Sequence, residues 1–321
     1  MLFPLFCFSQ IEQGKTIRSV EPLVNSIKSG DTLTIKVNML NPTVSNWVGL
    51  SLRDPLGRWF DVPSQQITLS SQEQTMTFKW RVPNSTDFVS GDFSARVAIW
   101  DRAPEEPDPV RIEYVDLEKV ATIFRHIDDF DHLDYRVWRV IEKRTPGLGF
   151  FKAENVIVQD GLLQMKFPIL TKDGGEIATN DGVVPPYGTF RAKIKTPSKM
   201  KGTYTTFFLY NPHNEDEVDI ELWNNKTNQI DFTIWIKATK IFSDKVELPF
   251  DPSKEFHEYR IDFYPGEISF WVDGQKYSFY KGEKGMPTSK MKIYINNWWP
   301  KWMEGSRKLK TGQALYDYIK Y

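Results

Sequence analysis

The chain has 321 residues, of which 40% are hydrophobic, and its 41 Lys and Arg side chains nearly balance 42 Asp and Glu, for a net charge of -1. This length suffices for one large domain or two medium ones with substantial cores. The balanced charge argues against a global field that would recruit nucleic acid or an anionic membrane, so we expect partners to be recognised at local sites.

The chain opens on "MLFPLFCFSQ", an apolar run too short to span a bilayer, which holds the only cysteine, Cys7. The run resembles the tail of a secretory signal peptide, although an ordinary apolar N-terminus is the alternative. We therefore interpret residues 1–15 as a signal-peptide remnant and leader, and expect a secreted, periplasmic or cell-surface protein. No other segment is apolar and long enough to cross a membrane.

Short alternating runs follow, among them "DTLTIKVNML", "QTMTFKWRV" and "DFSARVAIWD", separated by turn signals such as "NPTVSN" and "DPLG". Regular strands of period two predict a β-sandwich, which we place at residues 16–118. The segment resembles immunoglobulin-like accessory modules of secreted polysaccharide-degrading enzymes. Trp47, Trp59 and Trp100 indicate either a sugar-binding platform or the core and edge residues of a spacer, which we favour.

Residues 119–321 are also strand-like, as in "GTFRAKIKT", "GTYTTFFLY", "QIDFTIWIK" and "ALYDYIKY". In "YPGEISFWVDGQKYSFY" the Asp273-Gly274 pair separates two alternating runs, which predicts a β-hairpin. We see no convincing helical periodicity. The sequence therefore predicts an all-β protein of two β-sandwiches in tandem.

One stretch, "NEDEVDIELW" at residues 214–223, concentrates carboxylates. In a strand, Glu217, Asp219 and Glu221 project to one face while Val218 and Ile220 project to the other. Like charges aligned this closely hold at least one proton at higher pH than a free carboxyl group does. A protonated acid beside an ionised one is what glycoside hydrolysis requires. A solvated strand face and a calcium site are the alternatives.

The motif "DEVDIE" resembles the Glu-x-Asp-x-Glu signature of glycoside hydrolase family 16. "DDFDHLDYRVWRV", "GGEIATND", "YGTFRAKIK" and "FHEYRIDFYPGEISFWVDGQ" resemble further blocks of that family, in the right order over about residues 125–321. The nearest resemblance is to bacterial lichenases, which are 1,3-1,4-β-glucanases. It implies a concanavalin-like jelly-roll domain at 119–321, and a retaining endo-acting hydrolase that needs no cofactor for catalysis.

The resemblance also assigns roles. Glu217 corresponds to the nucleophile, Glu221 to the general acid and base, and Asp219 to a residue that hydrogen-bonds the nucleophile. Trp223 continues the same strand face. The other positions that match cleft residues of the family are Glu176, Phe208, Tyr210, Trp235, Asn296 and Trp298. Asn297 and Trp299 have the same spacing as Asn296 and Trp298, so the register there stays open, and strand aromatics of this kind also fill cores.

Several positions depart from the lichenase pattern. Ala178 stands where lichenases have Arg, Glu215 where they have Trp, Thr233 where they have Asn, and another cleft Asn is replaced near Gly147. Family members often hold a structural calcium ion, for which Asp317 and Gly161 occupy the corresponding places. An ordinary Asp at a strand end is the alternative.

These observations predict a monomeric retaining endo-β-glycanase that acts on a β-glucan-type polysaccharide, either mixed-linkage 1,3-1,4 or 1,3-β-glucan. Transglycosylation uses the same carboxylates, and hydrolysis of another polysaccharide such as a galactan would use the same site. The alternative of a different class is a non-catalytic carbohydrate-binding protein. An intact Glu217 and Glu221 pair argues against it, because binding alone has no use for that pair.

Overall fold

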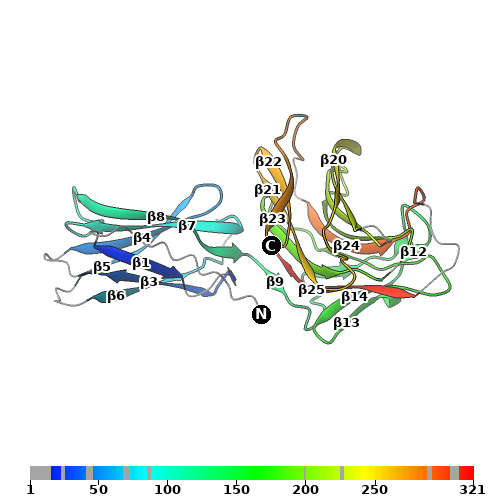
Figure 1. Cartoon of the computed structure of the whole chain (residues 1–321), viewed down its shortest axis with the longest axis horizontal. Coiled ribbons are helices and arrows are strands. Elements are labelled where there is room, and N and C mark those ends of the chain that lie inside the picture. The colour runs from blue at the N-terminus through cyan, green and yellow to red at the C-terminus, as the bar shows by residue number, and fades with distance from the viewer. Residues whose placement is uncertain are drawn as a thin grey trace. The chain divides into compact units, whose positions relative to one another are not determined.

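The computed structural model describes residues 16–22, 26–40, 46–67, 73–84, 88–198, 200–224, 228–287, 291–303 and 311–321. The predicted leader, residues 1–15, lies outside them. The chain divides into two compact units, Met1–His126 and Ile127–Tyr321. Both are built from strands, as predicted, and the described residues hold one short 3-10 helix, η1 (Ala153–Asn155) (Figure 1).

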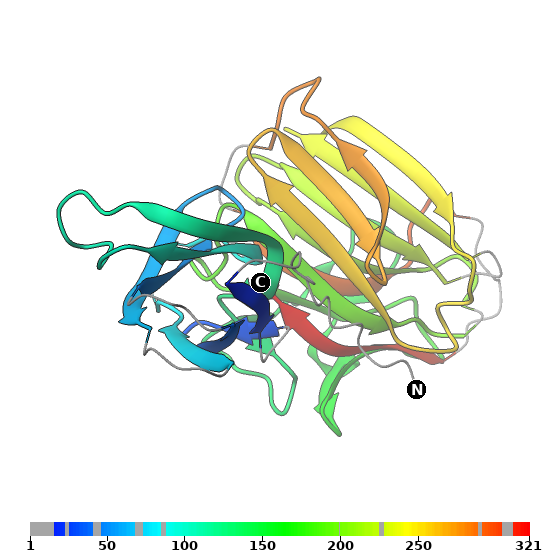
Figure 2. The same cartoon turned by 60° about the vertical axis from the view of Figure 1, so that its left-hand side comes forward.

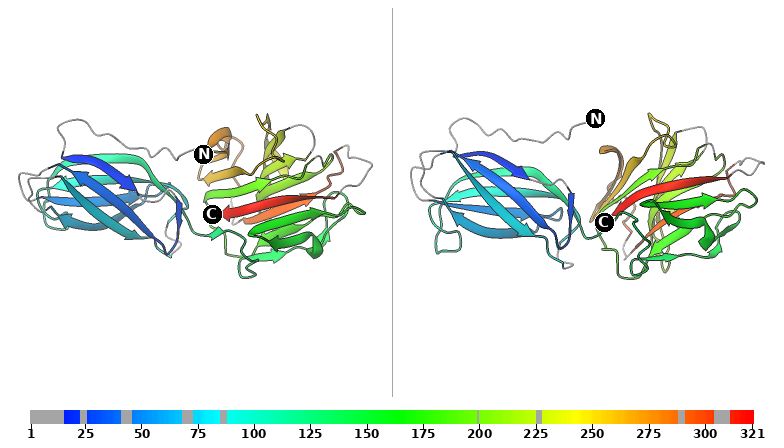
Figure 3. Two further views of the ribbon diagram at one scale, coloured as in Figure 1. Left: turned by 60° about the horizontal axis from the view of Figure 1, so that its bottom comes forward. Right: turned by 90° about the horizontal axis from the view of Figure 1, so that it is seen from below.

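The N-terminal unit is a sandwich of two sheets (Figures 1 and 3). Alternate residues of its strands point inward, so that Leu33, Ile35 and Val37 are buried in the core between the sheets. One sheet has the order β1 (Ile17–Pro22), β3 (Thr32–Met39), β6 (Gln74–Arg81). The other has the order β2 (Ser26–Lys28), β8 (Arg111–Phe124), β7 (Gly91–Trp100), β4 (Trp47–Arg53), β5 (Trp59–Gln66).

The three tryptophans predicted for a platform or a spacer lie on strands of the five-stranded sheet. Trp59 is 46% exposed, while Trp47 and Trp100 are half-buried and pair with each other across β4 and β7. Their neighbours in the strands, Val48 and Ile99, belong to the core. The tryptophans therefore lie on the outer face of this sheet. The immunoglobulin-like assignment of the unit as a whole stays a prediction.

The C-terminal unit is a second sandwich, whose two large sheets face each other (Figure 2). The seven-stranded sheet has the order β10 (Trp138–Val140), β15 (Glu176–Thr179), β24 (Lys292–Trp298), β17 (Tyr204–Tyr210), β18 (Glu217–Trp223), β19 (Gln229–Ile236), β20 (Thr239–Glu247). The eight-stranded sheet has the order β13 (Val156–Gln159), β14 (Leu162–Phe167), β25 (Gly312–Lys320), β16 (Gly188–Lys195), β21 (His257–Tyr264), β22 (Glu267–Val272), β23 (Gln275–Tyr280), with β9 (Ile127–Asp128) beside β25. A small hairpin joins β11 (Lys143–Arg144) to β12 (Phe150–Phe151).

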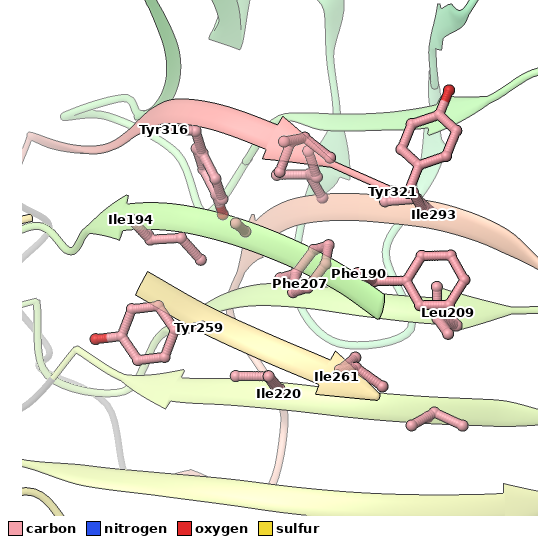
Figure 4. Packing of buried hydrophobic residues seen from close by; sticks show 14 of the residues in the cluster. Phe190, Ile194, Phe207, Leu209, Ile220, Tyr259, Ile261, Ile293, Tyr316 and Tyr321 are labelled. Atoms are coloured by element: carbon pink, nitrogen blue, oxygen red, sulfur yellow. The ribbon is translucent and has the colours of Figure 1, made fainter. Parts of the chain in front are cut away.

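The core between these sheets fixes which face of the seven-stranded sheet is left for a site. Phe207 and Leu209 of β17 and Ile220 of β18 point toward Phe190 of β16 and Ile261 of β21 (Figure 4). All of them are almost fully buried. Because strand side chains alternate, the residues between them on β17 and β18 face away from the core.

Two local predictions from the sequence are confirmed. Asp273 and Gly274 both have positive φ, +48° and +79°, and Val272 pairs with Gln275, which gives the two-residue hairpin between β22 and β23. Along β18, Val218 and Ile220 are fully buried in the core. The acidic side chains of that strand therefore share the opposite face.

Candidate active site

The acidic strand β18 lies inside the seven-stranded sheet, flanked by β17 and β19. Each acidic residue of β18 is paired with residues of β17 and β19, and the paired side chains form a row across the outer face of the sheet. The rows are Tyr210, Glu217 and Trp235; then Phe208, Asp219 and Thr233; then Thr206, Glu221 and Asp231; then Tyr204 and Trp223. Aromatic and hydroxyl side chains thus surround the acids, and no lysine or arginine of β17 or β19 stands in these rows.

The two acidic residues just before β18 have a structural role. Asp216 is almost fully buried, and its carboxylate accepts hydrogen bonds from the Lys237 backbone N–H at 3.0 Å and from Asn214 Nδ2 at 3.0 Å. Glu215 has positive φ, +59°, and its carbonyl accepts from the Ala238 N–H. These contacts fasten the β17–β18 turn to the β19–β20 turn and so fix the start of β18.

Hydrogen bonds and burial set the protonation of the three acids. Burial raises the pKa of Asp219 well above its usual range, and the charges of Glu217 and Glu221 raise it further. Asp219 accepts a hydrogen bond from Thr233 Oγ1, which in turn accepts from Trp235 Nε1 at 3.1 Å. Asp219 therefore keeps its proton and donates a hydrogen bond to Glu217.

The two glutamates differ in their surroundings. Burial raises the pKa of Glu217 to about 7, although the hydrogen bond from Asp219 and the Lys143 ammonium oppose the shift. Burial raises the pKa of Glu221 to about 8, with Glu217 and Asp231 adding to the shift. Of the two glutamates, Glu217 thus ionises first as the pH rises, and Glu221 holds its proton to higher pH. One ionised and one protonated glutamate near neutral pH is the division of labour that acid-base chemistry needs.

A cleft of about 390 Å³ opens over these acids. Its size is typical of a small-molecule or sugar subsite. It is lined by Lys143, Arg144, Pro146, Glu176, Thr206, Phe208, Tyr210, Glu217, Asp219, Glu221, Tyr294, Asn296 and Trp298. The structure therefore brings the three acids together with five of the predicted cleft residues, which are Glu176, Phe208, Tyr210, Asn296 and Trp298.

Glu176 is held by two side chains in the cleft wall. It is 2% exposed, its Oε2 accepts from Asn296 Nδ2 at 2.8 Å, and its Oε1 lies 2.9 Å from the Lys143 ammonium. Asn296 Oδ1 accepts in turn from Thr206 Oγ1 at 2.5 Å. Burial raises the pKa of Glu176, and Lys143 is the main opposing influence. Loss of Lys143 would leave this buried carboxylate without a counter-charge.

The open register around Asn296 is resolved by the structure. Asn296 and Trp298 face the cleft, whereas Asn297 is fully buried on the other side of the sheet. There Asn297 accepts from the Gly175 N–H at 2.7 Å and donates to the Met165 carbonyl at 2.9 Å. Trp299 packs edge-on against Phe167 in the same direction. Asn297 and Trp299 are therefore framework residues.

Two predicted cleft residues lie on the outer face but outside the cleft. Trp235 stands beside Glu217, and the Lys240 ammonium lies 4.7 Å from its ring centre. Trp223 stands at the far end of β18, with Lys245 5.0 Å from its ring centre and Tyr204 packed edge-on against it. Both lysines belong to the edge strand β20, so cations cover these rings.

The aromatic residues that line the cleft or pack against its lining form two groups. Phe208 and Tyr294 stack with ring centres 5.2 Å apart, and Tyr210 packs edge-on against Tyr294. Tyr204, Trp298 and Trp302 form the other group, in which Trp298 and Trp302 meet edge-on at 5.3 Å. The register places the first group near Glu217 and Asp219, and the second beyond Glu221.

The cleft residues that sequence reasoning missed are Lys143, Arg144, Pro146, Thr206 and Tyr294. The spacing of Thr206 from Phe208, and of Tyr294 from Asn296, is a signal that strand alternation could have supplied. For Lys143, Arg144 and Pro146 in the β11–β12 hairpin, the sequence shows no strand alternation that would predict a place in the cleft. A Cβ on Gly147 would meet the Trp299 carbonyl oxygen at 2.0 Å, so glycine alone lets the hairpin approach β24 and place Lys143 beside Glu176.

The departures from the lichenase pattern have local explanations. Ala178 is fully buried against the Phe208 and Tyr294 rings, and the cation beside Glu176 comes from Lys143 instead of from the position of Ala178. Thr233 replaces an Asn and donates its hydroxyl to Asp219.

The residues at the predicted calcium site do not form a set of oxygen ligands that suits a calcium ion. Asp317 Oδ2 accepts from the Lys193 ammonium at 2.7 Å, which neutralises the carboxylate that calcium would use. Gly161, at φ +69°, lies in the turn between β13 and β14. Among the described residues, no group of three or more His, Cys, Asp or Glu side chains is arranged to hold a metal ion. Calcium binding here stays a prediction, and the ion pair between Lys193 and Asp317 argues against it.

None of the helices in the described part of the chain has the length and apolar character needed to span a membrane.

The sequence profile described as "Glycosyl hydrolases family 16" matches residues 149–320, more than half of the chain. The chain belongs to glycosyl hydrolase family 16. The matched segment includes β18 with all three acids, and leaves Lys143 and Arg144 outside it.

Curated relatives of this family 16 chain carry the name beta-glucanase. That of Acetivibrio thermocellus is 32% identical over 147 residues, which cover 42% of this chain and 42% of that protein. That of Bacillus subtilis is 28% identical over 143 residues, covering 42% of this chain and 58% of that protein. The chain thus spans about half the length of these relatives.

Solved structures show the fold of this family 16 protein. A Bacillus licheniformis beta-glucanase has a TM-score of 0.56 at 22% identity, covering 61% of this chain and 96% of that chain. The catalytic domain of a Thermotoga petrophila laminarinase, described as an endo-1,3-beta-glucanase, has a TM-score of 0.56 at 17% identity and the same coverage. The predicted jelly-roll β-sandwich is therefore confirmed.

Proposed function

We propose that the chain is a retaining endo-β-glycanase that uses Glu217 as nucleophile and Glu221 as general acid and base. The observation that supports this most strongly is the set of three acids on one strand face in an open cleft, of which Asp219 is buried and Glu217 and Glu221 are half-buried. None of the three forms an ion pair with a described residue, and burial raises the pKa of each. Burying unpaired acids is costly, and catalysis is the use that explains it.

In the first step the ionised Glu217 attacks the anomeric carbon and forms a glycosyl ester. The bond to the leaving oxygen breaks, and that oxygen takes the proton of Glu221. Asp219, protonated and hydrogen-bonded to Glu217, orients the nucleophile without competing for the sugar. Glu221 is left ionised at the end of this step.

In the second step Glu221 removes a proton from water, and the resulting hydroxide displaces Glu217 from the anomeric carbon. The ester bond breaks, Glu217 regains its charge and Glu221 its proton, so both acids return to their starting states. Two inversions restore the original anomeric configuration. If a sugar hydroxyl replaces water, the same step gives transglycosylation.

The placement of the aromatic rings supports endo action. By strand register Phe208 and Tyr294 stand in the row of Asp219, and Trp298 stands one row beyond Glu221, in contact with Trp302. Ring faces and edges of this kind pack against the C–H faces of pyranose rings. Aromatic rings that extend over more than one row of the cleft suit a polymer whose neighbouring sugar units are held while it is cut internally.

The proposed substrate is a β-glucan, either mixed-linkage 1,3-1,4 or 1,3-linked, because the curated relatives are named beta-glucanases. A galactan is the second candidate, since Ala178 and Thr233 alter positions that lichenases use. We further propose an immunoglobulin-like accessory role for residues 16–118. We also propose a secreted, periplasmic or cell-surface location, and a monomer whose partner is the polysaccharide.

The test is a panel of purified polysaccharides, including barley mixed-linkage glucan, laminarin, xyloglucan, agar, porphyran and carrageenan, with linkage analysis of the products. We expect reducing ends from a β-glucan with wild type and none with Glu217→Gln. Equal release by both proteins from every polymer would refute the enzyme assignment. Release from galactans alone would refute the glucan assignment and leave the mechanism standing.

A further inference from the structure

Another buried acid stands beside β18, the strand that carries the three cleft acids. Asp231 on β19 is paired in register with Glu221 on β18, so the two side chains lie next to each other on the outer face of the sheet. Directly paired side chains in antiparallel strands have Cβ atoms roughly 4.5–5.5 Å apart. Asp231 is only 5% exposed, and the mechanism proposed above makes no use of it.

The contacts of Asp231 are all long. Its Oδ2 lies 3.4 Å from Tyr204 Oη and 3.8 Å from the Lys245 ammonium, and its Oδ1 lies 3.4 Å from Gln229 Nε2. A carboxylate with short charge-assisted bonds would have its field largely cancelled by its partners. Asp231 is held in place by these contacts, and its negative charge still acts on Glu221.

Titratable groups face Glu221 from each strand packed around it. Glu217 and Asp219 come from β18 itself, Tyr204 from β17 and Asp231 from β19, while Lys240 and Lys245 come from β20. Burial and the charges of Glu221 and Asp231 raise the pKa of Tyr204, so the phenol stays neutral. Glu217 and Asp231 therefore raise the pKa of Glu221, while Lys240 and Lys245 on the edge strand lower it.

We propose that Asp231 is a positioning residue for the acid step, whose charge opposite Glu221 disfavours ionisation of Glu221 and keeps its proton available for the leaving oxygen. Lys245 limits this effect, because its ammonium stands between Asp231 and the Trp223 ring. The inference rests on the proposed function. It adds a residue that touches neither the sugar nor the reacting atoms.

The direct test is a 13C NMR titration of side-chain glutamate carboxyls in the full chain, with the Glu221 signal assigned by its loss in Glu221→Gln. We expect Asp231→Asn to lower the pKa of Glu221 by about one unit, the lower end of a neighbouring charge's effect. We expect Lys245→Met to raise it. Glu247→Gln on the same edge strand is the matched control, because Glu247 is exposed and is not among the groups acting on Glu221.

A second readout is the basic limb of kcat/KM on the glycan that wild type cleaves. Asp231→Asn should move this limb to lower pH, and Lys245→Met to higher pH, while Glu247→Gln leaves it in place. Titration of Glu221 at the wild-type pH in Asp231→Asn would overturn the inference. Because the titration needs no substrate, that result is distinct from failure of the proposed function, which the polysaccharide panel reports. If Asp231→Asn fails to fold, Asp231→Thr removes the same charge and takes its place in both measurements, because Lys245 also acts on Glu221 by its own charge.

Discussion

Two sheet faces of this protein carry acidic, basic and aromatic side chains, but the pKa values of their acids shift in opposite directions. On the five-stranded sheet of the N-terminal unit, Arg96 donates two hydrogen bonds to Asp116, at 2.6 and 2.8 Å, and its guanidinium lies over the Trp59 and Tyr114 rings. The hydrogen bond from Arg96 lowers the pKa of Asp116. This pairing favours the charged forms of both side chains and outweighs the opposing effect of partial burial.

On the seven-stranded sheet of the C-terminal unit, Asp219 is buried between the half-buried Glu217 and Glu221, and the pKa values of all three acids rise. The nearby cations are directed elsewhere, Lys143 to Glu176, and Lys240 and Lys245 to tryptophan rings. The difference teaches that exposure and pairing make a stable surface, while burial without a partner makes a proton donor. Residue composition alone does not distinguish the two faces.

The sharpest way to separate the faces is to neutralise one acid on each. Glu217→Gln removes the nucleophile and should lower kcat by about three orders of magnitude or more. Asp116→Asn makes the same chemical change on the other sheet and should leave kcat unchanged. Initial rates of reducing-sugar release measure both. An active Glu217→Gln protein would end the assignment of the nucleophile.

The next effect concerns Asp219, which burial keeps protonated. An amide can donate to Glu217 as the protonated acid does, so Asp219→Asn should retain about tenfold more activity than Asp219→Ala, the worth of a hydrogen bond to a charged group. Rates at the optimal pH give the comparison. Equal losses in the two variants would show that Asp219 acts as an ionised carboxylate.

Lys143 gives a smaller, pH-dependent effect. Its ammonium lowers the pKa of Glu217, so Lys143→Met should raise that pKa and move the acid limb of kcat/KM to higher pH, while Lys143→Arg should restore the wild-type position. The profile of kcat/KM against pH checks this. A change in rate with no movement of the acid limb would assign Lys143 a packing role only.

The smallest effects are on stability, and the two faces should differ in sign. Glu221 has a raised folded pKa, so its contribution to stability is full below about pH 4.3 and is lost as the pH rises through about 8. Glu221→Gln should therefore raise Tm at pH 8, by roughly a few degrees. Asp116 has a lowered pKa, so Asp116→Asn should lower stability at neutral pH by less than about 1 kcal/mol.

The difference for Asp116→Asn should vanish as the pH falls below its folded pKa, because both side chains are then neutral. Thermal unfolding followed by circular dichroism across pH 3–8 would show both trends. A Tm of Glu221→Gln below that of wild type at pH 8 would contradict the account of buried, unpaired acids.

Much of the fold could be predicted from sequence, because period-two alternation in strands such as β18 reports directly which face is buried. The apolar Val218 and Ile220 predicted that the acids of β18 lie on the opposite face, and the Asp273-Gly274 pair predicted a hairpin. The register of Asn296 against Asn297 could not be predicted, because both positions have the same spacing and only the contact of Asn297 with Gly175 and Met165 separates them.

The cation of the cleft could not be predicted either. Lys143 lies on a two-residue strand, and its approach to Glu176 depends on Gly147 and Gly149 contacting backbone far away in the sequence. Asp231 was also missed, because a lone acid in "QIDFTIWIK" carries no meaning until the register with Glu221 is known. Pairwise strand register is information that no single-strand pattern contains.

The most direct test of the central claim is the anomeric configuration of the first product, followed by proton NMR during cleavage of a β-glucan. The account predicts that the β-anomer appears first and that the α-anomer grows in later by mutarotation, because Glu217 and Glu221 act in two successive displacements. Appearance of the α-anomer first would contradict it.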